Sequence, residues 1–517
     1  MGNPAGPVLT WRDRTRQRLA REVFDVLIVG GGINGAGIAR DAALRGLSVA
    51  LIERNDFASG TSSRSSRLVH GGVRYLEHGF FHLVFESSRE RRTLLRIAPH
   101  LVHPLQFTWP VYRGARIPRW KLGAGLWLYD LLASFRNVAR HRRLSAASVL
   151  ASEPRLRRDG LKGGAIYFDA ATNDSRLTIA NVVDAAAAGA AALNYAEVTS
   201  LGFEGGRVSG ASVRDRFTDE QIEVRARAVV NATGPWTDAI SRMEDPSSAP
   251  AVHGTKGVHI AVPAGRVGNR AAITMLAHAD QRVMFVLPAG AHTIIGTTDT
   301  PTRQHPDQVR ATRADVQYLL DGANAYFPEA KLTADDVVAA WAGIRPLIAS
   351  GNSGNPANAS RESAVTVGPR GVIAVTGGKL TTYRAMSEEI ADTVQKYLGQ
   401  AVTASRTSER TLPGSGVRPE DGDGRVSERL TPELPYTVND VLAAVGHEMA
   451  CTIGDVLVRR THLAFEIRDH GAAVAPRVAA ILAPQLGWST SDVARQLDDY
   501  RAEVARLFTI DEAEPER

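Results

Sequence analysis

The sequence predicts an α/β protein with a discontinuous Rossmann-like dinucleotide-binding domain, an antiparallel-sheet substrate domain and a C-terminal helical domain. Three observations support this fold class. An apolar run at residues 26–29 leads through a glycine turn into an Ala-rich helical stretch. Alternating apolar segments between residues 252 and 298 are typical of antiparallel strands, and residues 438–508 show helical amphipathic periodicity.

The glycine turn has the spacing of a dinucleotide-binding fingerprint. Gly30 permits the tight turn, Gly32 lets backbone N–H groups approach a pyrophosphate, and Gly35 packs the helix on the strand. The helix N-terminus then holds the phosphates. A second apolar run, residues 47–52, ends in Glu53, which we expect to accept hydrogen bonds from a ribose.

Later segments return to the same domain. Residues 62–78 predict a polar, functional loop that feeds a helix at residues 80–97, and residues 167–193 suggest one long helix. A strand at residues 226–230 runs into the turn NATGPW, and a further strand leads through the double glycine of GGKLTTYR into a helix. The dinucleotide-binding domain is therefore expected to be discontinuous.

These patterns predict the following boundaries. We expect an N-terminal extension at 1–22, the dinucleotide-binding domain at 23–75, 150–250 and 345–400, the substrate domain at 76–149 and 251–344, a linker at 401–436 and the helical domain at 437–517.

Composition restricts the function classes. The 517 residues are 44% hydrophobic, as in a soluble globular protein, and Cys451 is the single cysteine, which excludes an intrachain disulfide. No signal peptide or membrane-spanning run is recognised. No metal site is expected, because the 14 histidines show no HExxH spacing. A formal net charge of +6 favours anionic partners, but no aromatic and basic motif predicts nucleic-acid binding.

The motifs together resemble those of the FAD-dependent glycerol-3-phosphate dehydrogenases. They are GGGINGAGIARDAALRGLSVALIE, TSSRSSRLVHGGVRYLEHG, NATGPW, GIRPL and GGKLTTYR, with HEMACTIGDVLVRRTHLAF in the helical region. The match is continuous over about residues 24–395 and loose beyond Arg460. The resemblance implies a D-amino acid oxidase-like fold, FAD as cofactor, and oxidation of sn-glycerol 3-phosphate to dihydroxyacetone phosphate. It also implies that electrons pass to a membrane quinone.

The resemblance assigns Tyr75, Arg345, Arg361 and Lys379 to the substrate. Arginine offers the paired donors that a phosphate accepts, although a surface salt bridge is the alternative for each cation. A neutral imidazole suits proton removal, and we place His70 ahead of His259 for this role. Arg345 and Lys379 complete the expected catalytic set.

The cofactor is expected to lie against the glycine turns, the hydroxyl-rich loop and the NATGPW and GGKLTTYR turns. The expected contacts are Gly30, Gly32, Ile33, Asn34, Gly35, Glu53, Arg54, Thr61, Ser62, Ser63, Ser66, Leu68, His70, Gly71, Gly72, Val198, Ala232, Gly234, Trp236, Gly378, Lys379, Leu380 and Thr381. Backbone N–H groups of GGKLTTYR at a helix N-terminus could stabilise charge on the reduced flavin. Thr298 and Asp299 are left out of the catalytic set, because an ordinary turn explains them equally well.

Residues 116–143 have an apolar centre with Trp120 and Trp127 between basic ends. This composition suits an interfacial helix on acidic lipid, and a core helix of the substrate domain explains it equally well. We therefore expect a cytoplasmic protein, peripheral on the inner face of the cell membrane. The sequence leaves open whether the protein forms a homodimer.

Other enzymes could share these motifs. An oxidase that passes electrons to oxygen would carry nearly all of them. An amino-acid oxidase on the same fold would need a carboxylate-binding arginine but no cluster sized for a phosphate dianion, and Arg345, Arg361 and Lys379 argue against it. A non-catalytic flavin-binding protein would not need the substrate-site candidates.

Overall fold

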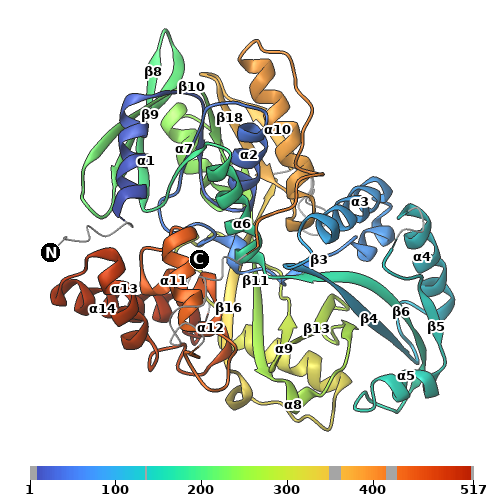
Figure 1. The fold of residues 1–517 in the computed structure, drawn as a ribbon. Helices are drawn as coiled ribbons and strands as arrows, with labels where there is room; N and C mark the ends of the chain where they lie inside the picture. Colours follow the sequence, from blue (N-terminus) through green and yellow to red (C-terminus); the bar gives the residue numbers. More distant parts are fainter. Residues whose placement is uncertain (1–8, 134–136, 349–362, 415–427, 514–517) are drawn as a thin grey trace.

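The computed structural model describes residues 9–133, 137–348, 363–414 and 428–513. Two β-sheets and a group of helices from the C-terminal region form the molecule (Figure 1). Among the helices in these ranges, none is long and apolar enough to cross a membrane.

The first sheet has a parallel centre built from distant parts of the chain. Its order is β17-β18-β10-β1-β2-β7, with β8 and β9 extending antiparallel from β10. The strands are β1 (Val23–Val29), β2 (Val49–Ile52), β7 (Ala191–Leu193), β8 (Ala196–Glu204), β9 (Arg207–Asp215), β10 (Gln221–Asn231), β17 (Ser363–Val367) and β18 (Val372–Gly377). Because β18, β10, β1, β2 and β7 run parallel, their carboxyl ends share one edge, where ligands bind in open α/β sheets.

Helices cover both faces of this sheet. In β1, Val26 and Ile28 pack toward α2 (Ile33–Leu44), α6 (Asp174–Ala187) and α10 (Tyr383–Tyr397), whereas Leu27 and Val29 pack toward α1 (Leu9–Arg21) and α7 (Thr237–Glu244). The run is continuously apolar because a parallel strand buried on both faces needs apolar side chains in both directions. Helix α1 thus lies in the segment expected to be an N-terminal extension, and its Leu19 is fully buried.

The second sheet is mostly antiparallel. Its order is β15 (Thr300–Thr302), β11 (Val252–Pro263), β14 (His292–Gly296), β13 (Val283–Ala289), β12 (Ala272–Leu276), β4 (Val102–Tyr112), β6 (Leu161–Thr172) and β3 (Leu68–Val69), with β16 (Ala339–Ile348) beside β11 and β5 (Arg142–Leu144) beside β6. One face packs on α9 (Arg313–Tyr326), and α8 (Ala264–Val267) contacts β11 and β14. Phe107 stacks on Tyr167 and meets Phe285 edge to face, and all three line the cavity described below.

Three helices gather at the far end of this sheet. They are α3 (Phe81–Ile97), α4 (Arg119–Leu132) and α5 (Ala146–Ser152), and they lie at the right of Figure 1. Helices α3 and α4 are joined by a hydrogen bond of 2.7 Å from Arg91 Nη1 to Tyr129 Oη.

The C-terminal helices dock on both sheets. They are α11 (Val438–His447), the π-helical turn η7 (Asp455–Arg460), α12 (Leu463–Glu466), α13 (Ala475–Leu486) and α14 (Thr490–Phe508). Arg459 and Arg460 in η7 form buried ion pairs of 2.6 Å with Asp56, which follows β2. The helices are therefore tied to the first sheet by charge as well as by apolar packing.

Two sequence predictions about local structure were wrong. Residues 167–193 do not form one helix, because Tyr167 to Thr172 complete β6 and the helix begins only after Asn173, whose side chain accepts a hydrogen bond from Arg176 N. The Ala-rich run concealed this start. In the 116–143 segment the helix covers Arg119–Leu132 only, and Arg142 and Arg143 belong to β5, paired with β6.

Candidate active site

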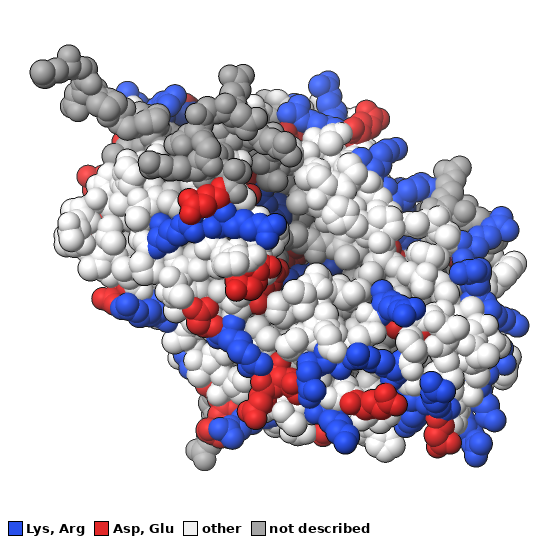
Figure 2. Space-filling model, turned by 60° about the horizontal axis from the view of Figure 1, so that its bottom comes forward, with Lys and Arg blue, Asp and Glu red and all other residues white. Residues whose placement is uncertain are grey.

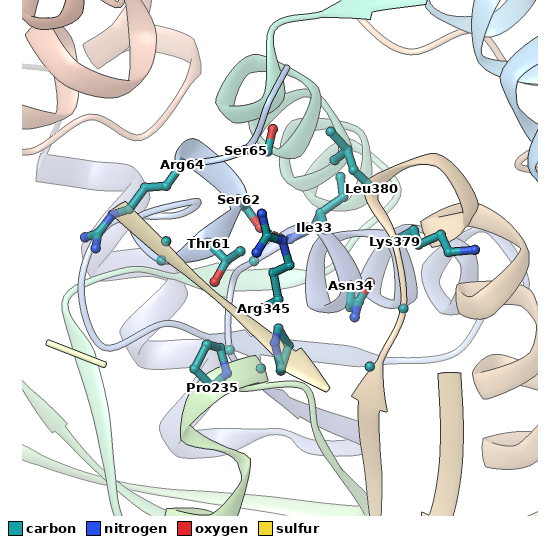
Figure 3. Close-up of a pocket in the computed structure, with 18 of the residues that line it drawn as sticks. Ile33, Asn34, Thr61, Ser62, Arg64, Ser65, Pro235, Arg345, Lys379 and Leu380 are labelled. Atoms are coloured by element: carbon teal, nitrogen blue, oxygen red, sulfur yellow. Dashed lines mark hydrogen bonds between the residues drawn. The ribbon is translucent and has the colours of Figure 1, made fainter. Parts of the chain in front are cut away.

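A cavity of about 430 Å³ lies at the carboxyl edge of the first sheet and extends under the second. Its volume is in the range of cofactor and small-molecule sites. Figure 3 shows Thr61, Asn34, Arg345 and Lys379 around it, each from a different element of the fold.

The glycine turn between β1 and α2 has no room for side chains at its critical positions. Gly30 has a φ of 107°, and a Cβ there would lie 2.7 Å from the carbonyl oxygen of Ala232. A Cβ on Gly35 would lie 1.8 Å from the carbonyl oxygen of Gly30. Gly32, Ile33 and Asn34 line the cavity at the N-terminus of α2. This is a cradle for a pyrophosphate, as the spacing predicts.

Glu53 lines the cavity at the end of β2. Its Oε2 accepts a hydrogen bond of 2.7 Å from Gly31 N, and its Oε1 accepts one of 2.8 Å from Asn55 N. Burial raises the pKa of Glu53, while these two backbone donors act in the opposite direction. Each oxygen keeps a second lone pair, so the carboxylate can accept from a ribose hydroxyl as well.

Another part of the cavity wall carries a hydrogen-bond donor that has no acceptor among the described residues. Trp236, in the short helix η3 (Gly234–Trp236), lines the cavity, and its indole Nε1 is buried with no hydrogen-bond partner among the described residues. The guanidinium of Arg54 lies 5.3 Å from the Trp236 ring. A buried N–H without an acceptor is costly, which fits a wall that an acceptor-rich dinucleotide would complete. The residues present therefore fit FAD.

The hydroxyl-rich loop joins the cavity to both sheets. Ser62 Oγ accepts a hydrogen bond of 2.9 Å from Ile33 N at the start of α2, and Thr61 Oγ1 donates one of 2.7 Å to Ile344 O in β16. Ser65 Oγ donates to Asp174 Oδ2 at 2.7 Å. These bonds fix the loop, part of which is the short helix η1 (Thr61–Ser63), so that its backbone borders the cavity.

Two histidines line the cavity in different environments. His259 Nε2 is 2.8 Å from Ser66 Oγ, its ring stacks on Trp341, and its Nδ1 is buried with no partner in the described chain. Burial, together with the charges of Arg345 and Arg67, lowers the pKa of His259 to about 3. His70 lies across the cavity after β3, where its backbone N–H is 3.1 Å from Thr381 Oγ1. Both rings belong to the same site.

Arg345 brings a guanidinium to the cavity from β16. Its Nη1 lies 3.0 Å from Asp299 Oδ1, and its Nη2 donates to Thr297 Oγ1 at 2.8 Å and to Thr298 O at 3.0 Å. Asp299 also pairs with Arg282 at 2.8 Å. These contacts orient Arg345, whose side chain is still 24% exposed and so remains reachable.

Lys379 and Tyr75 form another side of the cavity. Lys379 Nζ lies 4.1 Å from the centroid of the Tyr75 ring, and Tyr75 is buried in the short helix η2 (Val73–His78). Gly72, with a φ of 74°, approaches the same ring so closely that a Cβ would be 2.2 Å from Tyr75 Cδ2. Lys379, Tyr75 and Arg345 all line the cavity, so residues that carry positive charge and a hydroxyl border one space.

Most of the residues predicted from the sequence line this cavity. They are Gly30, Gly32, Ile33, Asn34, Glu53, Arg54, Thr61, Ser62, Ser66, Leu68, His70, Gly72, Tyr75, Val198, Ala232, Gly234, Trp236, His259, Arg345, Gly378, Lys379, Leu380 and Thr381.

Four predicted residues are not part of this lining. Gly35 packs against Gly30, Ser63 Oγ donates to Gly60 O, and Gly71 N donates to Asp169 at 2.9 Å. Direct contact of these three residues with the cofactor stays a prediction. Arg361 lies outside the described residues.

The sequence reasoning missed several residues of the site. Asp169 lines the cavity and accepts hydrogen bonds from Gly71 N and Tyr129 Oη, and Arg64 lines it from the hydroxyl-rich loop. Trp341 stands behind His259. Only Arg64 had a usable signal, since it interrupts the run of serines; Asp169 and Trp341 meet the site through strand pairing between distant segments.

Comparisons with known proteins agree with this geometry. The family described as FAD dependent oxidoreductase matches residues 25–393, and the C-terminal domain of alpha-glycerophosphate oxidase matches residues 383–493. Glycerol-3-phosphate dehydrogenase 2 of Mycobacterium tuberculosis is 37% identical over 555 residues, covering 99% of this chain and 92% of that protein. The mitochondrial glycerol-3-phosphate dehydrogenase of Homo sapiens is 36% identical over 533 residues, covering 92% of this chain and 72% of that protein.

A solved structure extends this likeness to the fold. The glycerol-3-phosphate dehydrogenase of Bacillus halodurans, complexed with FAD, superposes with a TM-score of 0.77 at 31% identity. The match covers 96% of this chain and 97% of that one.

Proposed function

Because the chain belongs to the FAD-dependent oxidoreductase family, and within it to the glycerol-3-phosphate dehydrogenases, we propose that it oxidises sn-glycerol 3-phosphate to dihydroxyacetone phosphate. The observation that carries the proposal is one cavity that combines a dinucleotide cradle with Arg345, Lys379 and Tyr75. A phosphate dianion needs positive charge, and Arg345 and Lys379 bring two cations to the cavity besides the N-terminus of α2.

The residues around the cavity divide the reaction into two transfers. Bound FAD supplies the acceptor for the hydride that leaves the C2 carbon of the substrate. The hydroxyl proton on the same carbon goes to an imidazole, so the C–H and O–H bonds break as the carbonyl forms. Arg345, oriented by Asp299, and Lys379 hold the phosphate, and Tyr75 closes the same side of the pocket.

We assign the proton to His70 in preference to His259. A general base works best when its pKa lies near the working pH. A pKa of about 3 makes His259 a weak base, and its Nε2 is already engaged with Ser66. His259 then acts as a neutral, oriented wall of the site.

The test is an anaerobic reaction of the FAD-loaded protein with sn-glycerol 3-phosphate, followed by flavin absorbance. Bleaching by this compound, and not by D-alanine or glycine, is the expected result. Bleaching by an amino acid instead would favour an amino-acid oxidase, and no bleaching by any of the three would leave only a flavin-binding protein.

We also propose that a membrane quinone takes the electrons. The reduced protein should then be reoxidised quickly by a soluble quinone analogue and slowly by air. Fast reoxidation by air with formation of hydrogen peroxide would identify an oxygen-using oxidase, which shares nearly all the sequence motifs.

We further propose a peripheral membrane contact through the exposed surface of α3 and α4. On α4 the side chains of Trp120 and Trp127 are 70% and 55% exposed, and at the start of α3 Phe81 and Phe85 are 47% and 46% exposed. Figure 2 shows Lys and Arg gathered along the right-hand edge of the molecule, the end to which α4, β5 and α5 belong. Aromatic side chains beside basic ones suit the interface of an acidic bilayer, and this position is consistent with a cytoplasmic protein on the inner face of the cell membrane.

Sedimentation with vesicles tests the contact. Replacing Trp120 and Trp127 by Ala should weaken binding to vesicles that contain an anionic phospholipid. Val402→Ser, at another exposed apolar residue that is 43% accessible, serves as the control. Equal binding of both variants and the parent protein would remove this surface from consideration.

A further inference from the structure

A second cavity, of about 580 Å³, lies behind the active site. It is lined by the ends of β3 and β6, the hairpin between β13 and β14, and the C-terminal helices. Ser66 and Leu68 line both cavities, so only the short strand β3 and the residues before it separate them. Apolar walls come from Leu101, Leu105, Leu287 and Leu434.

Arg67 lines this second cavity, and two of its guanidinium nitrogens have no acceptor within the part of the chain that the structure describes. Its backbone is left-handed, with a φ of 54°, and its guanidinium lies 5.4 Å from the Trp341 ring and 4.9 Å from the Phe465 ring. Nε and Nη2 are buried and have no hydrogen-bond partner among the described residues. The charge of Arg67 also acts on the carboxylates of Asp174 and Glu466, but neither forms a hydrogen bond with these two nitrogens, so two charged N–H positions stay unsatisfied among the described residues.

Thr172 adds a second unsatisfied group at the same place. Its backbone N–H donates a hydrogen bond of 2.9 Å to Arg67 O across the end of the β3–β6 pair. Its side chain lines the cavity and is 6% exposed, yet Oγ1 has no partner in the described chain. Two neighbouring residues thus offer N–H and O–H donors for which the described residues supply no acceptor.

Three other charged residues around this cavity already have partners. Arg176 is paired with Glu448, and Arg460 with Asp56 at 2.6 Å. Asp440 accepts from Thr437 N at 2.7 Å in the cap of α11.

Of the remaining carboxylates, Glu466 accepts from Tyr436 Oη at 3.2 Å, and burial raises its pKa while the charge of Arg67 lowers it; Glu433 precedes α11 and lines the cavity. Arg67 has no ion pair within 4.0 Å among the described residues. It is therefore the cation of this cavity that is best placed to take a ligand.

We propose that this second cavity binds a small molecule carrying an oxyanion, a carboxylate or a phosphate, through Arg67 and Thr172. The oxyanion would accept from the guanidinium and the hydroxyl, and its carbon portion would lie on the leucine wall. Arg67 follows Ser66, whose hydroxyl is hydrogen-bonded to His259 in the active site, and Trp341 contacts both Arg67 and His259. An occupant is thereby coupled to the flavin environment.

Calorimetric titration of the FAD-loaded protein with inorganic phosphate, and separately with benzoate, tests the proposal. Saturating dihydroxyacetone phosphate is included to occupy the substrate site. We expect one additional oxyanion per chain, bound about tenfold or more weakly after Arg67→Gln or Thr172→Val, the range for loss of a charge-assisted hydrogen bond. Arg495→Gln, which removes an equal charge from the exposed surface of α14, is the matched control.

The outcomes are distinct. Binding of phosphate, or of benzoate alone, that is lost in both variants supports the site and identifies which oxyanion it accepts. If neither probe binds, or if both variants bind like the parent, the proposal is wrong. The readout needs no turnover, and the Arg67 variant removes one binding event even if dihydroxyacetone phosphate fails to occupy the flavin site. Failure here is therefore separable from failure of the proposed activity.

Discussion

Replacing Asp56 by Asn should destabilise the protein strongly, because this carboxylate compensates two buried arginines. Its Oδ2 accepts from Arg459 Nε and Arg460 Nη1, each at 2.6 Å, and the three side chains are at most 3% exposed. Arg459 retains Asp455 and Glu503 as partners, whereas the next carboxylate of Arg460 is Glu448, at 3.9 Å. Breaking a buried pair in this way costs about 3–5 kcal/mol.

A surface pair provides the matched comparison. Asp307 forms a 2.9 Å pair with Arg54, and the two side chains are 37% and 33% exposed. Asp307→Asn removes the same charge but should cost less than about 1 kcal/mol, because solvent screens the pair. Urea unfolding of the FAD-loaded proteins, followed by circular dichroism and flavin fluorescence, gives both differences. A loss for Asp56→Asn no larger than that for Asp307→Asn would refute the reasoning.

The contribution of the Asp56 carboxylate to stability should also depend on pH. Burial raises the pKa of Asp56, but the charges and hydrogen bonds of Arg460 and Arg459 lower it by more. The pKa of Asp56 therefore lies below its usual value of 3.8. A lowered pKa means that the stabilisation is fully present above the unfolded value and is lost as the pH falls through the folded value. The difference between the parent and Asp56→Asn should stay constant from about pH 8 to 5 and shrink only below about pH 4.

Three further predictions concern the active site. Gly35→Ala should yield protein without bound flavin, measured by the ratio of visible to ultraviolet absorbance, because its Cβ would lie 1.8 Å from Gly30 O. His70→Asn should slow flavin reduction by about 10²–10⁴-fold in stopped flow with little change in substrate affinity, as expected for loss of a general base. Arg345→Lys should raise the Kd for sn-glycerol 3-phosphate about tenfold, measured from the concentration dependence of reduction, because lysine keeps the charge but loses the paired donors.

Local signals made the cofactor half of the site predictable. The turn from Gly30 to Gly35 depends on contacts within one strand, turn and helix, and the structure places it as the spacing predicts. The helix at Phe81–Ile97 also follows from local periodicity. The prediction of one long helix at residues 167–193 was wrong. The Ala-rich pattern does not reveal that residues 167–172 complete β6 and pair with β4.

Contacts between distant segments could not be predicted in this way. Asp299 was set aside as part of an ordinary turn, yet it orients Arg345 of β16 from the connection between β14 and β15. Asp56 and Arg459 are separated by 403 positions, and neither lies in a periodic pattern that points to the other. Such pairs arise from the packing of whole domains, which a single sequence encodes only through the complete fold.

One short segment shows why the domains cannot be treated as independent around this site. Asp56 is held by Arg459 and Arg460 of the C-terminal helices, Thr61 by Ile344 of the substrate sheet, and Ser66 by His259. The segment that borders the cofactor cavity is therefore fixed from three directions. A perturbation of the C-terminal helices should reach the flavin through it, and for this reason flavin fluorescence is an informative probe of Asp56→Asn.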